Sequence, residues 1–253
     1  MNYQQTFIKS DEEKFYNLIK DYNEIYFITG YGNVGDFLIY EGTRTLLSKL
    51  NISYKEIHIS HAKVYKGELA LICGGGAWCS VFNHYMPQSL PLIEKNFKNV
   101  IVLPSSFQVS EPLVQVGLSK SKALFLCREM ESYNQIKDIC NCDLMHDFAF
   151  HFDYSTYKQN GNGVLNSFRT DSETTIPYAA DNNMDISNMD ITLHEWLILI
   201  SMNEIINTDR AHVMIAGAMM GKTINYRPTS YHKVPAIAEF SLKGLPVFDS
   251  NNQ

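Results

Sequence analysis

Short apolar runs alternate with helical patterns along most of the chain, and no other feature restricts its fold as strongly. The runs have the length of buried strands, and glycine, serine or a charged residue follows most of them. In a parallel α/β sheet each strand is followed by a helix that carries the chain back to the start of the next strand. Ligands of such sheets bind at the carboxyl ends of the strands. We therefore predict an α/β protein with a doubly wound parallel sheet.

The alternation defines the elements expected in the first part of the chain. The expected strands are 25–29, 53–59, 69–73, 100–103, 124–127 and 144–146. The expected helices are 36–50, 87–96 and 129–140, and a turn is expected at Gly74-Gly75-Gly76.

A polar stretch from residue 154 to 163 follows and is predicted to be a linker. We expect an N-terminal Rossmann-like lobe over residues 1–155 and a short C-terminal lobe with a closing helix over residues 162–253. In the second lobe the expected strands are 164–168 and 204–207, and the expected helices are 193–202, 211–220 and 233–242.

Composition argues against several classes of protein. Of 253 residues, 45% are hydrophobic and 19% are charged, which is typical of a globular protein. No apolar run reaches the roughly 20 residues that a membrane-spanning helix needs, and the polar start is unlike a signal peptide. A net charge of -6 argues against a general nucleic-acid binder. Five cysteines predict no disulfide framework, and no cluster of metal ligands is seen. We expect a cytoplasmic protein without a bound metal.

Two polar clusters follow apolar runs and open expected helices. They are Gly30-Tyr31-Gly32-Asn33-Val34-Gly35-Asp36 and Thr208-Asp209-Arg210-Ala211-His212. The start of a helix presents unpaired N–H groups and the positive end of the helix dipole, so it favours anions. Asp209, Arg210 and His212 add an acid, a cation and a possible proton carrier. The two clusters therefore predict a site for an anionic substrate.

Arginine is rare in this chain, which uses lysine for most of its positive charge. Arg128, Arg169 and Arg210 each lie just after an apolar run. Arginines kept at strand ends indicate bidentate recognition of a carboxylate or a phosphate. Structural ion pairing is the alternative explanation, and the sequence leaves it open.

Three further motifs also have two explanations. The spacing Gly30-x-Gly32-x-x-Gly35 is formally a dinucleotide fingerprint, but Asp36 would repel a pyrophosphate, and a turn with Asp36 capping the helix explains it as well. Gly75 and Gly76 would let a backbone approach a ligand, or they form only a turn. Ser105 and Ser106 follow a strand and offer hydroxyl and N–H groups.

Taken together, these motifs resemble the polysaccharide pyruvyl transferase family. The matching pieces are Gly32-Asn33-Val34-Gly35-Asp36, Gly74-Gly75-Gly76, Leu103-Pro104-Ser105-Ser106, Arg128-Glu129-x-x-Ser132, Asp147, Arg169-Thr170-Asp171-x-Glu173, Thr208-Asp209-Arg210-x-His212 and Tyr231-His232-Lys233. The resemblance implies two lobes like those of the GT-B glycosyltransferases. It also implies transfer of pyruvate from phosphoenolpyruvate to a sugar of a capsule, an exopolysaccharide or a precursor, as a cyclic ketal. Ser105 and Ala211 depart from the family, which often has Gln and a bulky aliphatic residue there.

The resemblance also suggests roles for the candidate residues. Arg128, Arg169, Arg210 and Lys233 would bind phosphoenolpyruvate, with His212 as general acid, Asp209 as its orienting partner and Asp36 as base. Further substrate contacts would come from Asn33, Gly35, Gly75, Gly76, Ser105 and Ser106. Phosphoenolpyruvate is expected as donor substrate, with no other cofactor, no metal and no nucleic acid. The form of the saccharide acceptor and the oligomeric state stay open; a lipid-linked acceptor would bring the protein to the inner face of the membrane.

Two other functions fit a fold of this kind, because the fold does not determine the function. One is a GT-B glycosyltransferase that uses a sugar nucleotide, and the other is a binding module for a phosphorylated metabolite.

Overall fold

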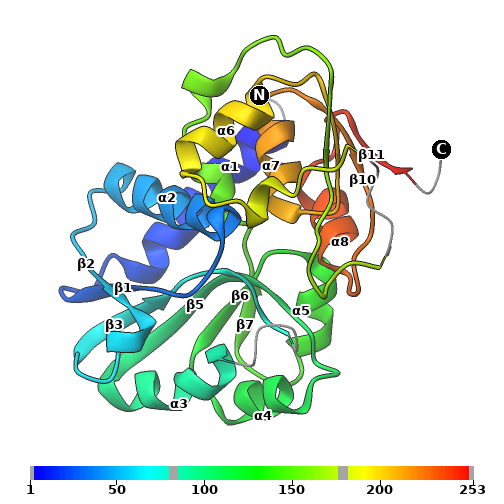
Figure 1. Ribbon diagram of the computed structural model, residues 1–253. Coiled ribbons are helices and arrows are strands. Elements are labelled where there is room, and N and C mark those ends of the chain that lie inside the picture. Colours follow the sequence, from blue (N-terminus) through cyan, green and yellow to red (C-terminus); the bar gives the residue numbers. More distant parts are fainter. Residues whose placement is uncertain (1–2, 80–84, 176–181, 251–253) are drawn as a thin grey trace. The chain divides into compact units, whose positions relative to one another are not determined.

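In the computed structural model, which describes residues 3–79, 85–175 and 182–250, the chain divides into two compact units (Figure 1). The first comprises residues up to Tyr31 and Thr43–Phe148, and the second comprises Gly32–Gly42 and the residues from Ala149 onwards. Each unit contains a parallel sheet with helices between its strands. The prediction of an α/β protein with parallel sheets is therefore confirmed.

The first unit contains a seven-stranded sheet. Its strands are β1 (Ile25–Thr29), β2 (Lys55–His58), β3 (Gly67–Ile72), β4 (Gly75–Trp78), β5 (Phe97–Phe107), β6 (Leu124–Cys127) and β7 (Cys142–Leu144), in the order β2-β1-β3-β5-β6-β7 with β4 paired to β5. The strand order changes direction between β1 and β3, so the chain leaves the carboxyl ends of these two strands toward opposite edges of the sheet. Such a switch point is where doubly wound sheets bind ligands. Gly30 and Gly74 lie just beyond it.

The helices of this unit are α1 (Tyr3–Ile19), the second part of α2 (Val34–Lys49), α3 (Tyr85–Asn96), α4 (Pro112–Lys120) and α5 (Met130–Ile136). Helix α3 packs on β5 and lies beside α4 (Figure 1). On β4, β5 and β6 the rings of Trp78, Phe107 and Phe125 pack together with centroids 5.5 to 5.8 Å apart. These fully buried aromatic side chains form the core beneath the carboxyl ends of the central strands.

The second unit contains a four-stranded parallel sheet in the order β11-β10-β9-β8. Its strands are β8 (Val164–Ser167), β9 (Ile205–Thr208), β10 (Thr223–Tyr226) and β11 (Val247–Asp249). Between them run α6 (Leu193–Ser201), α7 (Ala211–Met219) and α8 (Lys233–Ser241). Helix α7 packs on β9 and β10 and contacts both α6 and α8. The carboxyl ends of β8 and β9 are followed by Arg169 and by Asp209 and Arg210, so this order brings the charged residues together.

Two predicted features differ from the structure near the glycines. Gly74-Gly75-Gly76 was expected as a turn, whereas Gly75–Trp78 forms β4, which pairs with β5. Strand β5 extends through Pro104 and both serines to Phe107 instead of ending at Leu103. Pro104 has no N–H to give to the ladder, and the pairing of β5 with β6 shifts between Val102 and Ser105. Gly75, Gly76 and Pro104 thus lie inside strands, because the pairings of β5 with β4 and with β6 are both irregular in register.

Helices α1 and α4 and strands β10 and β11 are not among the predicted elements. The buried positions of α1 follow helical spacing, but they include the polar residues Gln4 and Asp11 beside Phe7, Phe15 and Ile19. Asp11 accepts hydrogen bonds from the backbone N–H and the ring Nδ1 of His146, at 3.0 and 2.9 Å. A polar residue with a distant partner interrupts the apolar stripe, so the sequence alone gives a weak helical signal.

The lobe boundary is expected near residues 155–162, whereas the compact units of the structure meet in the chain between Phe148 and Ala149. The segment Gly32–Gly42, expected in the first lobe, clusters with the second unit. The reason is local, because a Cβ atom at Gly35 would lie only 3.0 Å from Nδ1 of His212 on α7.

Gly74 lies where the backbone after β3 meets β5. A Cβ atom at this position would overlap the carbonyl oxygen of Pro104, and backbone atoms cannot rotate away as a side chain can. We expect Gly74→Ala to lower the free energy of unfolding by about 1–3 kcal/mol, as overpacking does. The measurement is urea unfolding of both proteins. Gly217→Ala is the control, since its Cβ atom would meet only the ends of the Ile206 and Ile224 side chains; an equal loss in both variants would contradict the argument.

Candidate functional site

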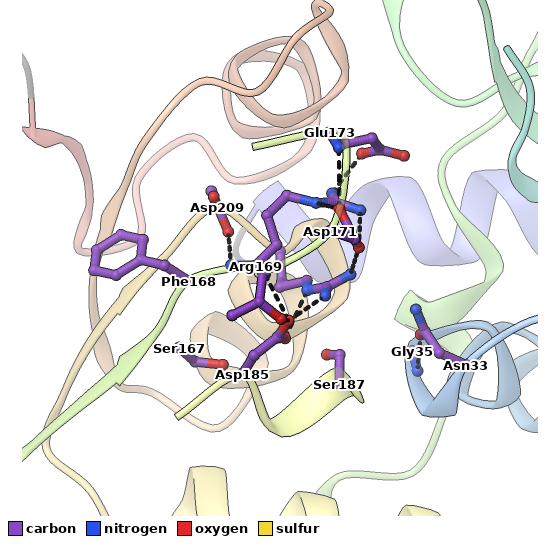
Figure 2. Close-up of polar contacts among 12 residues, drawn as sticks. Asn33, Gly35, Ser167, Phe168, Arg169, Asp171, Glu173, Asp185, Ser187 and Asp209 are labelled. Atoms are coloured by element: carbon purple, nitrogen blue, oxygen red, sulfur yellow. Dashed lines mark hydrogen bonds and ion pairs between the residues drawn. The ribbon is translucent and has the colours of Figure 1, made fainter. Parts of the chain in front are cut away.

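The carboxyl ends of β8 and β9 carry a network of buried charges in the second unit (Figure 2). We call this network the arginine cluster; it consists of Arg169, Asp171, Glu173, Asp185, Asp209, Arg210 and Lys233. Four of the predicted site residues belong to it, namely Arg169, Asp209, Arg210 and Lys233. Strand pairing between β8 and β9 explains why residues 40 positions apart in the chain meet here.

Arg169 follows β8 and is almost completely buried. Its Nε and Nη2 atoms donate to the two carboxylate oxygens of Asp171, at 2.6 and 3.0 Å. Its Nη1 atom forms an ion pair with Glu173, and its backbone N–H donates to Asp209 at 2.7 Å. Burial alone would lower the pKa of Arg169, but the hydrogen bonds to Asp171 and the charge of Glu173 raise it. The guanidinium group is therefore held as a fixed cation.

Arg210 precedes α7 and is held in the same way by a second acid. Its Nε and Nη2 atoms bind the carboxylate of Asp185 at 2.9 and 2.5 Å, and its Nη1 atom lies 3.0 Å from Asp171. Asp185 also accepts hydrogen bonds from the backbone N–H and the hydroxyl of Thr170, at 2.8 and 3.0 Å. Asp185 therefore ties the loop after β8 to the start of α7.

Lys233, at the start of α8, forms an ion pair with Glu173 and lies 4.9 Å from the centre of the Tyr231 ring. Glu173 is completely buried and bridges Lys233 and Arg169 through the same oxygen, Oε2. Within the described part of the chain, its other oxygen, Oε1, is buried and has no hydrogen-bond partner.

The cluster shifts the pKa values of two acids in opposite directions. Burial raises the pKa of Asp209, although the backbone N–H of Arg169 and the nearby arginines oppose the shift. Burial also works to raise the pKa of Asp171, but the hydrogen bonds from Arg169 and the charge of Arg210 outweigh it and lower that pKa to about 2. Asp171 is therefore an anion at neutral pH.

A second group of predicted residues lies at the start of α2, in the same unit. The side-chain oxygen of Asn33 accepts from the N–H of Gly35, and the carboxylate of Asp36 accepts from the N–H of Asn33, both at 2.9 Å. These reciprocal contacts are a helix cap, so the capping explanation of Asp36 is confirmed as a structural role. Gly35 also brings the half-buried His212 close, since only the missing Cβ atom leaves room for the imidazole.

The remaining predicted residues lie in the first unit. Arg128 is 1% exposed, and it donates to the hydroxyl of Ser106 and to the carboxylate of Asp147, both at 2.8 Å. The hydroxyl of Ser105 donates to the carbonyl of Leu103, so it is directed along its own strand. These contacts stabilise the carboxyl ends of β5 and β6.

Gly75 and Gly76 lie in β4, and Gly75 has a φ angle of 127°, which favours glycine. Contact of these glycines, of Arg128 or of the two serines with a substrate stays a prediction.

Comparison with known proteins identifies the family. The profile of the family described as polysaccharide pyruvyl transferase matches residues 33–223, which is more than half of the chain. The chain belongs to the polysaccharide pyruvyl transferase family. The predicted resemblance is thereby confirmed, and the protein is a pyruvyltransferase of polysaccharide biosynthesis with a saccharide acceptor.

A solved structure shares the fold of this pyruvyltransferase. It is the crystal structure of a functionally uncharacterized protein from Klebsiella pneumoniae, with a TM-score of 0.75 and 24% sequence identity over 96% of each chain. No curated protein matches the chain. Among the described residues, no helix is both long and apolar enough to cross a membrane.

Sequence reasoning missed three of the four acids of the arginine cluster, namely Asp171, Glu173 and Asp185. Asp171 and Glu173 occur in one of the motifs that match the family but receive no role there, and Asp185 is not among the candidate residues. Nothing in the spacing of Asp185 marks it, because it meets Arg210 only after the chain has folded. The only available signal was indirect: an arginine buried at a strand end requires an acid from elsewhere in the chain.

The pyruvyltransferase should depend on Asp185 for stability. Asp185→Ala would leave the buried Arg210 without its bidentate partner, and we expect the free energy of unfolding to fall by about 3 kcal/mol. The measurement is denaturant unfolding followed by circular dichroism. Glu56→Ala, which breaks the half-exposed ion pair with Arg44, is the matched control and should cost less than about 1 kcal/mol. Equal losses would show that the pair with Arg210 is no more important than a surface contact.

Proposed function

We propose that the protein transfers pyruvate from phosphoenolpyruvate to a sugar of a cell-surface polysaccharide or its precursor, forming a pyruvate ketal. The family match supplies the reaction class, and the two guanidinium groups that converge at the strand ends are the observation that supports an anionic donor. Phosphoenolpyruvate carries both a carboxylate and a phosphate, and guanidinium groups bind both with paired N–H donors. No further cofactor is required for this reaction.

The proposed reaction balances without an oxidant or a metal. A proton is added to the methylene carbon of phosphoenolpyruvate, which leaves an oxocarbenium-like centre at the adjacent carbon. A sugar hydroxyl adds to that centre and loses its proton, and the C–O bond to phosphate then breaks. A second hydroxyl of the sugar closes the ketal and releases the second proton, so inorganic phosphate is the other product.

We assign the proton transfer to His212, whose imidazole suits a general acid at neutral pH. Asp209 follows β9 and would orient His212 or support Arg210, and Asp36 would accept a proton from the sugar. Arg169, Arg210, Lys233 and Arg128 would neutralise the donor. Backbone N–H groups at Gly75, Gly76 and the start of α2, with Asn33, Gly35, Ser105 and Ser106, would hold oxygen atoms of the substrates.

The two parallel sheets support a fold related to the GT-B glycosyltransferases. Lobes over residues 1–155 and 162–253 remain part of this proposal. We further propose that the enzyme works in the cytoplasm, where phosphoenolpyruvate is available. A lipid-linked acceptor would bring it to the inner face of the membrane.

The proposal is tested by phosphate release from phosphoenolpyruvate with a panel of hexose and N-acetylhexosamine glycosides. We expect release with at least one sugar, accompanied by a pyruvyl adduct in the product mass. No release with any sugar, together with thermal stabilisation by a sugar nucleotide, would point instead to a glycosyltransferase.

The assignment of His212 makes a separate prediction. His212→Ala should lower kcat for phosphate release by about 10²–10⁴-fold, which is the usual contribution of a general acid. The KM for phosphoenolpyruvate should change little, because the arginine cluster stays intact. His194→Ala, an exposed histidine on α6 of the same unit, is the control and should keep full activity. Wild-type turnover in His212→Ala would remove this residue from the mechanism.

A further inference from the structure

Asp171 occupies a particular place in the arginine cluster, because both guanidinium groups converge on its carboxylate. Arg169 donates to it through Nε and Nη2, and Arg210 approaches it through Nη1 at 3.0 Å (Figure 2). Three N–H donors from two arginines thus point at a single oxyanion. This is the arrangement that binds a carboxylate or phosphate group of a ligand.

The carboxylates of the cluster differ strongly in exposure. The side chain of Asp171 is 36% exposed, whereas those of Glu173 and Asp185 are 0% and 5% exposed. Asp209 is also buried. Of these four acids, Asp171 is therefore the one that can leave its arginines for water without crossing the protein interior.

Few contacts would have to break for the Asp171 side chain to leave the arginines. Residues 168–175, which include Asp171, lie outside helices and strands, and apart from the arginines the Asp171 carboxylate accepts the backbone N–H of Glu173 at 3.1 Å. The acids that fix the position of the two guanidinium groups are different ones: Asp185 holds Arg210, and Glu173 holds Arg169. Departure of Asp171 would thus leave both arginines in place with free N–H donors.

The balance of charge gives a reason for this movement. The arginine cluster contains three cations and four carboxylates, so an anionic donor would be repelled by the cluster as it stands. Asp171 does not lose its charge near neutral pH, since its arginine partners keep its pKa low. Protonation therefore does not free the arginines, and only displacement does.

We propose that Asp171 holds the place of the donor's carboxylate or phosphate in the empty enzyme and is displaced into solvent when the donor binds. This inference rests on the proposed function for the identity of the donor. Asp171 then competes with the substrate for the two arginines. The apparent affinity for anions equals the intrinsic affinity multiplied by the fraction of molecules in which Asp171 has left the arginines. A purely structural Asp171 would have the opposite effect, since its loss would loosen Arg169 and Arg210.

The test measures binding of sulfate and of phosphoenolpyruvate by calorimetry, together with the KM for phosphoenolpyruvate. Asp171→Asn should bind both anions about three- to fivefold more tightly than the wild type and show a correspondingly lower KM. Asp171→Ser, which is also neutral, should behave in the same way and serves if the first variant does not fold. Tighter binding in a variant with a cooperative thermal transition supports the proposal, and unchanged or weaker binding overturns it.

Two controls separate displacement from a general change of charge. Asp171→Glu keeps the anion and should show no gain in affinity. Asp190→Asn removes one negative charge from an exposed position of the same unit and should leave both affinities unchanged. An equal gain in Asp190→Asn would overturn the proposal.

The proposed function can fail separately. If the wild type neither binds phosphoenolpyruvate nor releases phosphate with any sugar, that function is wrong, and the sulfate titrations alone then decide whether an anion displaces Asp171.

Discussion

The second unit depends on how the charges of two buried arginines are compensated. A guanidinium group stays protonated at any ordinary pH, so burying it requires carboxylates within ion-pair distance. Asp185, Asp171 and Glu173 supply them for Arg210 and Arg169. Acids of the cluster also accept hydrogen bonds from backbone N–H groups: Asp185 accepts from Thr170, and Asp209 accepts from Arg169. The loop after β8 and the start of α7 are therefore ordered by charge as much as by apolar packing.

Much of the fold could be predicted because its strands are short, apolar and regularly separated. Strands β1 and β6 and helix α7 lie within about one residue of their predicted bounds. The failures have physical causes. Helix α1 contains the buried Asp11, whose partner His146 is 135 residues away in the chain. Strand β4 begins at Gly75, whose positive φ angle is typical of a turn. Local patterns do not reveal polar contacts between distant residues.

The cations of the candidate site could be predicted, whereas of its four acids only Asp209 could. Arg128, Arg169 and Arg210 stand out because arginine is rare in this chain and each follows an apolar run. Asp185 lies in a polar stretch with other acids, so neither spacing nor composition distinguishes it. The sequence left open whether the arginines bind a ligand or form structural ion pairs. The structure shows the ion pairs. The greater exposure of Asp171 than of Asp185 is the reason why we propose that a ligand anion replaces Asp171.

The site that we propose for a multiply charged donor meets two opposing demands. Unpaired guanidinium groups at the strand ends would be costly in the empty protein, whereas fully buried pairs would exclude the ligand. Acids of graded exposure satisfy both demands: Asp185 and Glu173 keep the arginines oriented, and the half-exposed Asp171 can be exchanged. Withdrawing Asp171 to water restores its hydration, so the exchange costs far less than breaking a buried pair. In the proposed exchange some affinity for the donor would be lost, but the arginines would be in position before it arrives.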